Sequence, residues 1–128
     1  MINVAIAMIN SLKENIVLKK SIDFSLAVIA YCEKLDEQRK FIISNQLLRS
    51  ATSIGANIHE AQNAESRADF IHKMKIAAKE LEEVKYWLTL CEQAPTYAFE
   101  PKLKLDAQEL GKIIFKILST SKKNQLLH

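Results

Sequence analysis

The 128-residue chain has only two glycines and two prolines, the residues that most often interrupt regular structure. This scarcity is typical of long helices with few breaks. No apolar run approaches the length needed to cross a bilayer, so we expect no membrane-spanning segment. The first ten residues lack the basic region and cleavage site of a signal peptide, which favours a cytoplasmic protein.

Cysteine is also scarce, since the chain has only two, Cys32 and Cys91. They lie far apart, form no Cys-x-x-Cys motif and have no neighbouring histidine, so the usual zinc and redox patterns are absent. Both fall within apolar helical patterns. We therefore expect two small buried side chains in a reducing compartment.

What the chain does have is four rows of apolar residues spaced by three and four, here called seams, the pattern of amphipathic helices. The seams run from Phe24 to Leu35, from Leu47 to Ala61, from Phe70 to Cys91 and from Leu103 to Ile117. The pattern predicts a first helix at residues 21–36 and a second at residues 41–64. A third helix should begin at Arg67 and stop before Pro95. A fourth should run from Pro101 to about Ser121.

The expected starts of the first and third helices are marked by Ser21 and Ser66, residues that favour the N-cap position.

A second apolar row of Ile22, Leu26 and Ile29 should widen the core-facing side of the first helix. Each helix thus has one apolar face to bury.

Four amphipathic helices with short polar connections predict an all-α fold, most simply an antiparallel up-down-up-down four-helix bundle. We expect one domain over residues 1–128, with residues 1–13 as a ragged extension and residues 122–128 as a fraying tail. The third helix also carries Tyr86 and Trp87 outside its main apolar seam. This surplus apolar surface favours a homo-oligomer.

No set of residues indicates a catalytic or metal site. Asp69 and His72 have the spacing of one half of a di-iron motif, but the second copy is missing. There is no Gly-x-Ser-x-Gly motif and no glycine-rich phosphate loop. We predict that the chain is not an enzyme and carries no cofactor.

The second predicted helix carries a polar stripe directly beside its apolar seam. Arg49 flanks the stripe, and Glu80 and Glu83 on the third helix favour an arginine–glutamate bridge between helices or subunits. One interpretation is a satisfied polar network that fixes helix register or subunit pairing. The alternative is a polar groove that binds a ligand. The stripe consists of Gln46, Ser50, Ser53, Asn57 and Glu60.

Basic residues exceed acidic residues by 18 to 15, and the excess lies in residues 101–128, which have six basic and two acidic side chains. Mixed with glutamates, the lysines of the third helix are typical of a solvated face. In an oligomer, however, repeated patches would multiply contacts with phosphates. The candidate nucleic-acid-binding residues are Arg67, Lys73, Lys75, Lys79, Lys85, Lys112, Lys116, Lys122 and Lys123.

The stretch Ser44–Ala61, SNQLLRSATSIGANIHEA, resembles the motif of the bacterial four-helix bundle proteins known as ribosomal RNA intervening-sequence proteins. The likeness covers roughly residues 14–95. Further matches are Glu14-Asn15-Ile16, Lys20-Ser21-Ile22-Asp23-Phe24, Ser66, Asp69, Phe70, Lys73, Ala77, Lys79, Glu80 and Tyr86-Trp87-Leu88.

The resemblance implies a small four-helix bundle that assembles as a ring-like homopentamer, with no enzymatic activity. The accessory variability protein of diversity-generating retroelements shares this fold, and it binds a reverse transcriptase and RNA. By resemblance, Arg49, Asn57 and Glu60 match the family motif and are interpreted as structural. Together with the polar stripe and the third helix, the candidate structural or interface residues are Gln46, Arg49, Ser53, Asn57, Glu60, Glu80, Glu83 and Trp87.

The function that the resemblance implies is that of a nucleic-acid-associated accessory protein, which binds RNA or DNA phosphates through repeated lysine patches. A protein partner such as a reverse transcriptase would also fit this resemblance. The alternative is a protein-binding scaffold or adaptor with no nucleic-acid role, anchored by Tyr86 and Trp87, which we expect to be exposed.

Overall fold

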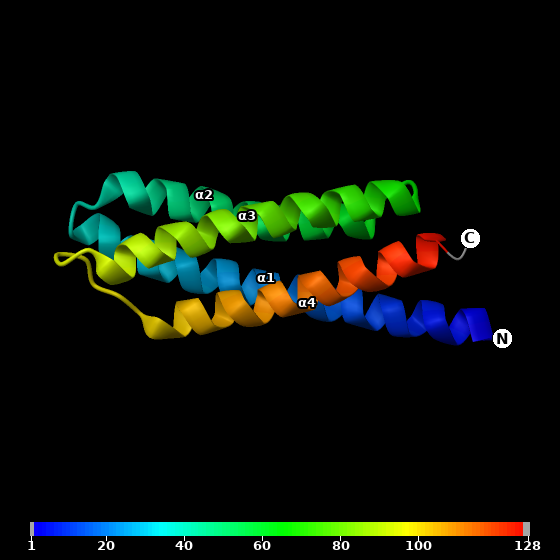
Figure 1. Ribbon diagram of the computed structural model, residues 1–128. Coiled ribbons are helices and arrows are strands. Elements are labelled where there is room, and N and C mark those ends of the chain that lie inside the picture. The colour runs from blue at the N-terminus through cyan, green and yellow to red at the C-terminus, as the bar shows by residue number, and fades with distance from the viewer. Residues whose placement is uncertain (1, 127–128) are drawn as a thin grey trace.

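The computed structural model describes the backbone of residues 2–126 and the side chains of residues 16–123. Within residues 2–126 there are four helices and no strand, which confirms the predicted all-α fold (Figure 1). The helices are α1 (Ile2–Glu37), α2 (Phe41–Gln62), α3 (Arg67–Gln93) and α4 (Pro101–Leu126).

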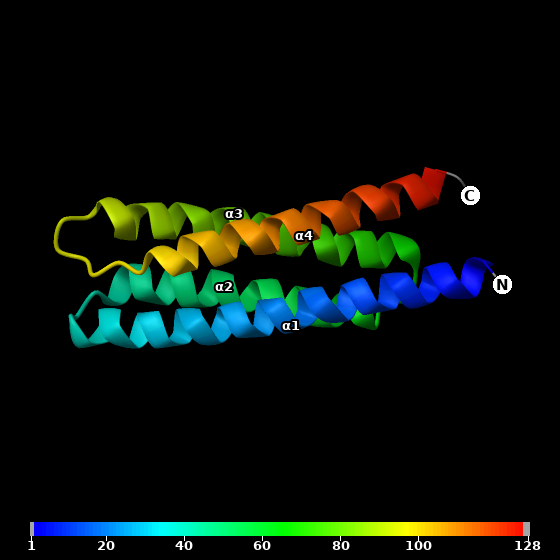
Figure 2. The same cartoon turned by 90° about the horizontal axis from the view of Figure 1, so that it is seen from below.

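Each helix packs against two neighbours. α1 contacts α2 and α4, and α3 contacts the same two helices, while the backbones of the diagonal pairs lie farther apart. The α1–α2 and α3–α4 connections lie at one end of the bundle, and the α2–α3 connection lies at the other (Figures 1 and 2). One apolar core therefore runs along the middle of the four helices.

The core consists largely of the predicted apolar seams. In α2 the five seam residues from Leu47 to Ala61 are all buried, and in α4 the seam from Leu103 to Ile117 is buried as well. In α3 the seam is buried from Met74 to Cys91, while Phe70 is only partly buried against the core and its neighbour Ile71 is buried. Truncation of such a core leucine or isoleucine to alanine costs about 2–5 kcal/mol.

The predicted start of the first helix at Ser21 is wrong, because α1 begins far upstream, at Ile2. Ser21 is buried within the helix, and its hydroxyl donates to the Leu18 carbonyl over 2.7 Å. A serine hydroxyl can find a hydrogen-bond partner inside a helix as well as at its N-cap. The presence of a serine alone therefore does not fix where the helix begins.

The end of the fourth helix was also placed too early, since α4 continues past Ser121 to Leu126. Ser121 itself is buried, so α4 still packs on the bundle at this position. The predicted fraying tail falls partly outside the described residues, which end before Leu127.

The expected widening of the α1 apolar face is wrong as well. Ile22, Leu26 and Ile29 are exposed by 49%, 59% and 37%, so this row lies on the outer surface of α1. The α1 residues that face the core are Val17, Phe24, Val28, Tyr31, Cys32 and Leu35. One face of α1 serves the core, and the second row is left uncovered.

Local hydrogen bonds explain where α1 ends and α3 begins. Arg39 adopts a left-handed conformation with φ of 61°, and the Lys40 N–H bonds the Leu35 carbonyl over 2.8 Å, which closes the end of α1. The predicted N-cap at Ser66 is confirmed, because its hydroxyl accepts from the Asp69 N–H over 3.0 Å.

Two buried side chains fix how α2 lies along α1. The Cys32 thiol donates to the Ser44 carbonyl over 3.4 Å, and the Ser44 hydroxyl donates to the Cys32 carbonyl over 3.3 Å. The two bonds satisfy both buried polar groups and set the register of the hairpin.

The α3–α4 connection is tied to the end of α1. The Tyr31 hydroxyl donates to the Ala98 carbonyl over 2.6 Å, and the Lys40 ammonium donates to the Thr96 hydroxyl over 3.1 Å. The same ammonium lies 5.2 Å from the centre of the Tyr97 ring.

In the described part of the chain, no helix is long and apolar enough to cross a membrane.

Candidate nucleic-acid interface

The outer surface between α2 and α3 holds the polar stripe and its ion pairs. Arg49 pairs with Glu80, at 3.4 Å, and with Glu83, and Glu60 pairs with Lys73 at 3.4 Å. The predicted arginine–glutamate bridge is therefore present, and it joins two helices of one chain. These pairs connect α2 to α3 along this surface.

The remaining stripe residues bond locally within α2. Asn57 donates its amide to the Ser53 carbonyl over 2.8 Å and to the Ser53 hydroxyl over 3.3 Å. The buried Ser50 hydroxyl donates to the Gln46 carbonyl over 2.9 Å, while the Gln46 side chain is exposed. Among the described side chains, no buried nitrogen or oxygen lacks a partner. This arrangement favours the structural interpretation of the stripe.

The two aromatic residues singled out on α3 differ in exposure. Trp87 is half-buried against the core, and its indole N–H donates to the Glu83 carboxylate over 3.2 Å. Tyr86 is 58% exposed and stacks edge-on against Trp87, with ring centres 5.2 Å apart. The expectation of two exposed aromatic anchors thus holds for Tyr86 and is wrong for Trp87.

The predicted phosphate-binding residues do not form one patch. Lys73 lies toward α2, where it pairs with Glu60, and so stands apart from the others. Lys85 lies toward α4 and pairs with Glu82 at 3.2 Å. The other predicted basic residues are exposed: Arg67, Lys75, Lys79, Lys112, Lys116, Lys122 and Lys123.

Helical periodicity divides these exposed residues further. Lys75 falls on the α4-facing side of α3, and Lys122 on the α3-facing side of α4, whereas Lys79 points outward from α3. Lys116 and Lys123 fall on the outer side of α4, turned toward α1. The largest basic grouping therefore follows the boundary between α3 and α4.

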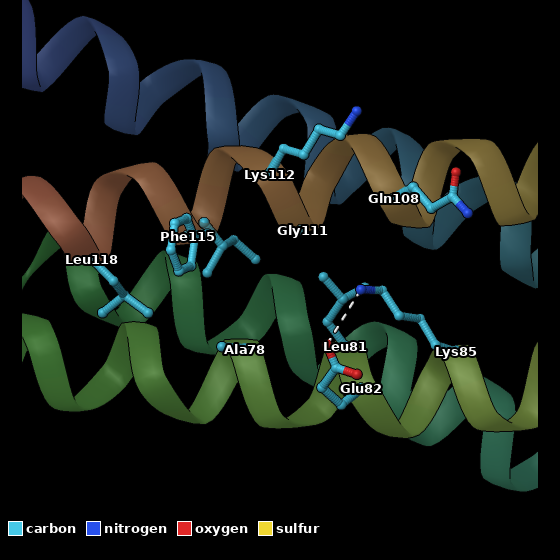
Figure 3. A pocket seen from close by; sticks show the side chains of 10 residues that line it. Ala78, Leu81, Glu82, Lys85, Gln108, Gly111, Lys112, Phe115 and Leu118 are labelled. Carbon is cyan, nitrogen blue, oxygen red and sulfur yellow. Dashed lines mark hydrogen bonds and ion pairs between the residues drawn. The ribbon is translucent and has the colours of Figure 1, made fainter.

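A groove runs along this boundary, with a volume of about 430 Å³ (Figure 3). Its walls combine apolar side chains with two lysines, Lys85 and Lys112, and with the amide of Gln108. Gly111 brings the two helices close together, because a β-carbon there would lie 3.1 Å from the Leu81 side chain. The lining residues are Ala78, Leu81, Glu82, Lys85, Gln108, Gly111, Lys112, Ile114, Phe115 and Leu118.

Phe115, which the sequence pattern did not single out, lines this groove and is 72% exposed. It lies beside Ile114 but outside the core seam of α4, and Lys112 and Lys116 are its neighbours along the helix. An aromatic residue off the seam and between two lysines is the signal that could have identified it.

The buried titratable groups lie apart from the groove. Burial raises the pKa of the Cys32 and Cys91 thiols, and burial also raises the pKa of Tyr31. All three groups therefore stay protonated at neutral pH, which does not suit nucleophilic chemistry. In the part of the chain that the structure describes, no three histidine, cysteine or acidic residues are placed to hold a metal ion.

The chain is similar to a solved structure from Bacteroides thetaiotaomicron VPI-5482, a protein with unknown function from the S23 ribosomal protein family. The two share 42% sequence identity and superpose with a TM-score of 0.78, over 84% of this chain and 98% of that one. No curated protein matches the chain. The family described as 23S rRNA-intervening sequence protein matches residues 13–116. Since this match spans most of the sequence, the chain belongs to the 23S rRNA-intervening sequence protein family.

Proposed function

We propose that the protein is a non-catalytic accessory protein of the cytoplasm that binds nucleic acid, with RNA as the favoured partner, through the lysines along α3 and α4. The observation that carries this proposal is the separation of charge between two neighbouring surfaces. On the α2–α3 surface, Arg49 and Lys73 are paired with glutamates, while the α3–α4 boundary has more lysines than acids.

Unpaired surface lysines suit phosphates because each contact releases condensed counterions, whatever the base sequence. Along the α3–α4 boundary, Lys75 and Lys122 are exposed, and Lys112 lines the groove. Lys85 is the exception, because Glu82 pairs with it. Family membership also supports RNA as the partner, because the family takes its name from an intervening sequence of 23S rRNA.

We also propose that the chain is an antiparallel up-down-up-down bundle and that it assembles as a homo-oligomer, a ring-like pentamer by family resemblance. The alternating ends of the connections support the topology (Figure 1). The uncovered apolar row of Ile22, Leu26 and Ile29 on α1 supports an interface between copies. A ring would repeat each lysine patch and so strengthen binding.

The oligomer is tested by Leu26→Glu, which places a charge in the middle of this row. We expect the solution mass to fall to that of a smaller species while helicity is retained. Leu105→Glu is the matched control, because Leu105 is similarly exposed, at 64% against 59%, but lies on α4. A wild-type protein that is already monomeric would contradict the assembly.

Nucleic-acid binding is tested with a labelled structured RNA and a DNA duplex across a salt series. The expected result is measurable RNA affinity near physiological salt that falls steeply as salt rises. The triple reversal of Lys75, Lys79 and Lys85 to glutamate should abolish binding. The control reverses Lys19, Lys34 and Lys102, which changes the net charge equally on α1 and at the start of α4.

The second candidate function is a protein-binding scaffold or adaptor, with a reverse transcriptase as one partner that the fold resemblance suggests. The exposed ring of Tyr86 favours it, since a large aromatic side chain on the surface is a common anchor. An intact oligomer that binds no RNA even at low salt would favour this candidate.

A further inference from the structure

Phe115 stands at the rim of the α3–α4 groove with its ring 72% exposed (Figure 3). The neighbouring apolar residues of α4, Ile114 and Ile117, fill the core, so the fold does not need this ring for packing. We propose that the groove binds an unpaired segment of RNA, with one base stacked on Phe115 and the adjoining phosphates held by lysines. This inference rests on the proposed function and specifies the form of RNA that is bound.

The groove offers a surface suited to a flat base. Leu81 and Leu118 provide apolar contact beside the ring, and Gly111 contributes no side chain. A β-carbon at Gly111 would meet the Leu81 side chain at 3.1 Å and the Lys85 ammonium at 3.4 Å. The bare backbone at this position therefore lets Leu81 and the Lys85 ammonium lie close to α4. The Gln108 amide also lines the groove and can both donate to and accept from a base.

The charges around the ring suit a sugar–phosphate chain. Lys85 and Lys112 line the groove on one side of Phe115. Ala78 of α3 lines the groove together with Leu118 of α4, so the helix register places Lys75 near Lys122, beyond the other side of the ring. A strand that passes over Phe115 would thus meet lysines before and after the stacked base.

The acidic content of the groove is low. Glu82 is the one acid among the lining residues that the structure describes, and it pairs with Lys85 at 3.2 Å. An exposed aromatic ring between lysines is the combination by which proteins hold single strands, because each base has a stacking face and each nucleotide has a phosphate. Bases inside a duplex are already stacked and cannot use the ring.

The test compares affinities for a single-stranded RNA of roughly 12 nucleotides and for the same sequence in a duplex. We expect Phe115→Leu to weaken single-strand binding roughly 10-fold and to leave duplex binding unchanged. Phe115→Tyr should retain wild-type affinity, because tyrosine keeps the ring. Tyr86→Leu is the matched control, since Tyr86 is an exposed aromatic outside the groove and its loss should have no effect.

Other outcomes overturn the inference. Unchanged single-strand affinity of Phe115→Leu, with RNA binding still dependent on the lysines, would remove the stacking site and leave the proposed function standing. An equal loss on the duplex, or an equal loss in Tyr86→Leu, would show that Phe115 does not select unpaired bases. A changed solution mass of Phe115→Leu would assign the ring to a contact between copies. If the wild-type protein binds neither RNA, both the inference and the proposed function fail.

Discussion

Arg49 of α2 and Glu83 of α3 form an ion pair across the outer surface of the bundle. The same glutamate oxygen accepts the indole N–H of Trp87 over 3.2 Å, one turn further along α3. Glu83 thus holds both the neighbouring helix and a half-buried tryptophan in place.

Removal of this pair should have a small effect, because the side chains of Arg49 and Glu83 are 50% and 37% exposed. We expect Arg49→Ala to lower the free energy of unfolding by less than about 1 kcal/mol. Glu83→Ala should cost more, since the Trp87 N–H also loses its partner. Urea denaturation of the single and double variants measures the coupling, which should shrink as salt rises. A coupling unaffected by salt would contradict a solvent-screened pair.

The end of α1 can be improved. Arg39 holds a left-handed conformation with φ of 61°. This conformation costs a residue with a β-carbon about 1–2 kcal/mol. We expect Arg39→Gly to raise the free energy of unfolding by about 0.5–1 kcal/mol, less than the full cost because glycine also stabilises the unfolded chain. The matched control is Gln38→Gly, outside the left-handed region, which should give no such gain.

The two glycines should respond differently to alanine. A β-carbon at Gly55 would lie at ordinary contact distances, 3.5 Å from the Ser21 hydroxyl and 3.6 Å from that of Ser25. Gly55→Ala should therefore stabilise the helix by up to about 1 kcal/mol. At Gly111 the same atom would lie 3.1 Å from the buried Leu81 side chain, so the helical gain should be offset by strain. Thermal unfolding of both variants would measure the contrast, and equal gains would contradict it.

Stability should decline at alkaline pH. Burial raises the pKa of Cys32 and Cys91 above the ordinary value of 9.0 in the folded protein. The folded state then holds its thiol protons longer than the unfolded state does, so this stability is complete below about pH 9 and is lost as pH rises through the folded values. Urea denaturation between pH 7 and pH 11 should show the decline.

Cys91→Ala removes one buried thiol and leaves intact the burial that is the main cause of the raised pKa of Tyr31. We expect a shallower decline of stability with pH in the variant. The native thiols should also react slowly with a maleimide at neutral pH, since both are buried. A decline as steep in Cys91→Ala as in the wild type would contradict a role for this thiol.

The fold was predictable where periodicity and local bonding agree. The α2 seam from Leu47 to Ala61 and the Ser66 cap both follow from spacing and hydroxyl chemistry, and the structure has both. Ser21 misled the boundary of α1 because its hydroxyl bonds a helical carbonyl instead of capping. A serine therefore marks the start of a helix only where the residues before it are not themselves helical.

The candidate site was less predictable because it depends on which helices are neighbours. The lysines of α3 and α4 were identified one by one, but only the packing of α3 on α4 brings Lys85 to the same groove as Lys112. Phe115 was missed for the same reason, since an apolar residue off the seam gains its meaning from the adjoining helix. The exposed row beginning at Ile22 was placed in the core because spacing alone cannot tell which face a neighbour covers.

The reciprocal bonds between Cys32 and Ser44 have a consequence for the order of folding. They join positions only 12 residues apart, across the turn between α1 and α2, so the loop closed in forming them is short. Contacts between residues close in sequence form quickly, whereas contacts between α4 and α1 join residues from opposite ends of the chain. We expect the α1–α2 hairpin to acquire its amide protection early in refolding, and α4 to join a partner whose alignment is already set.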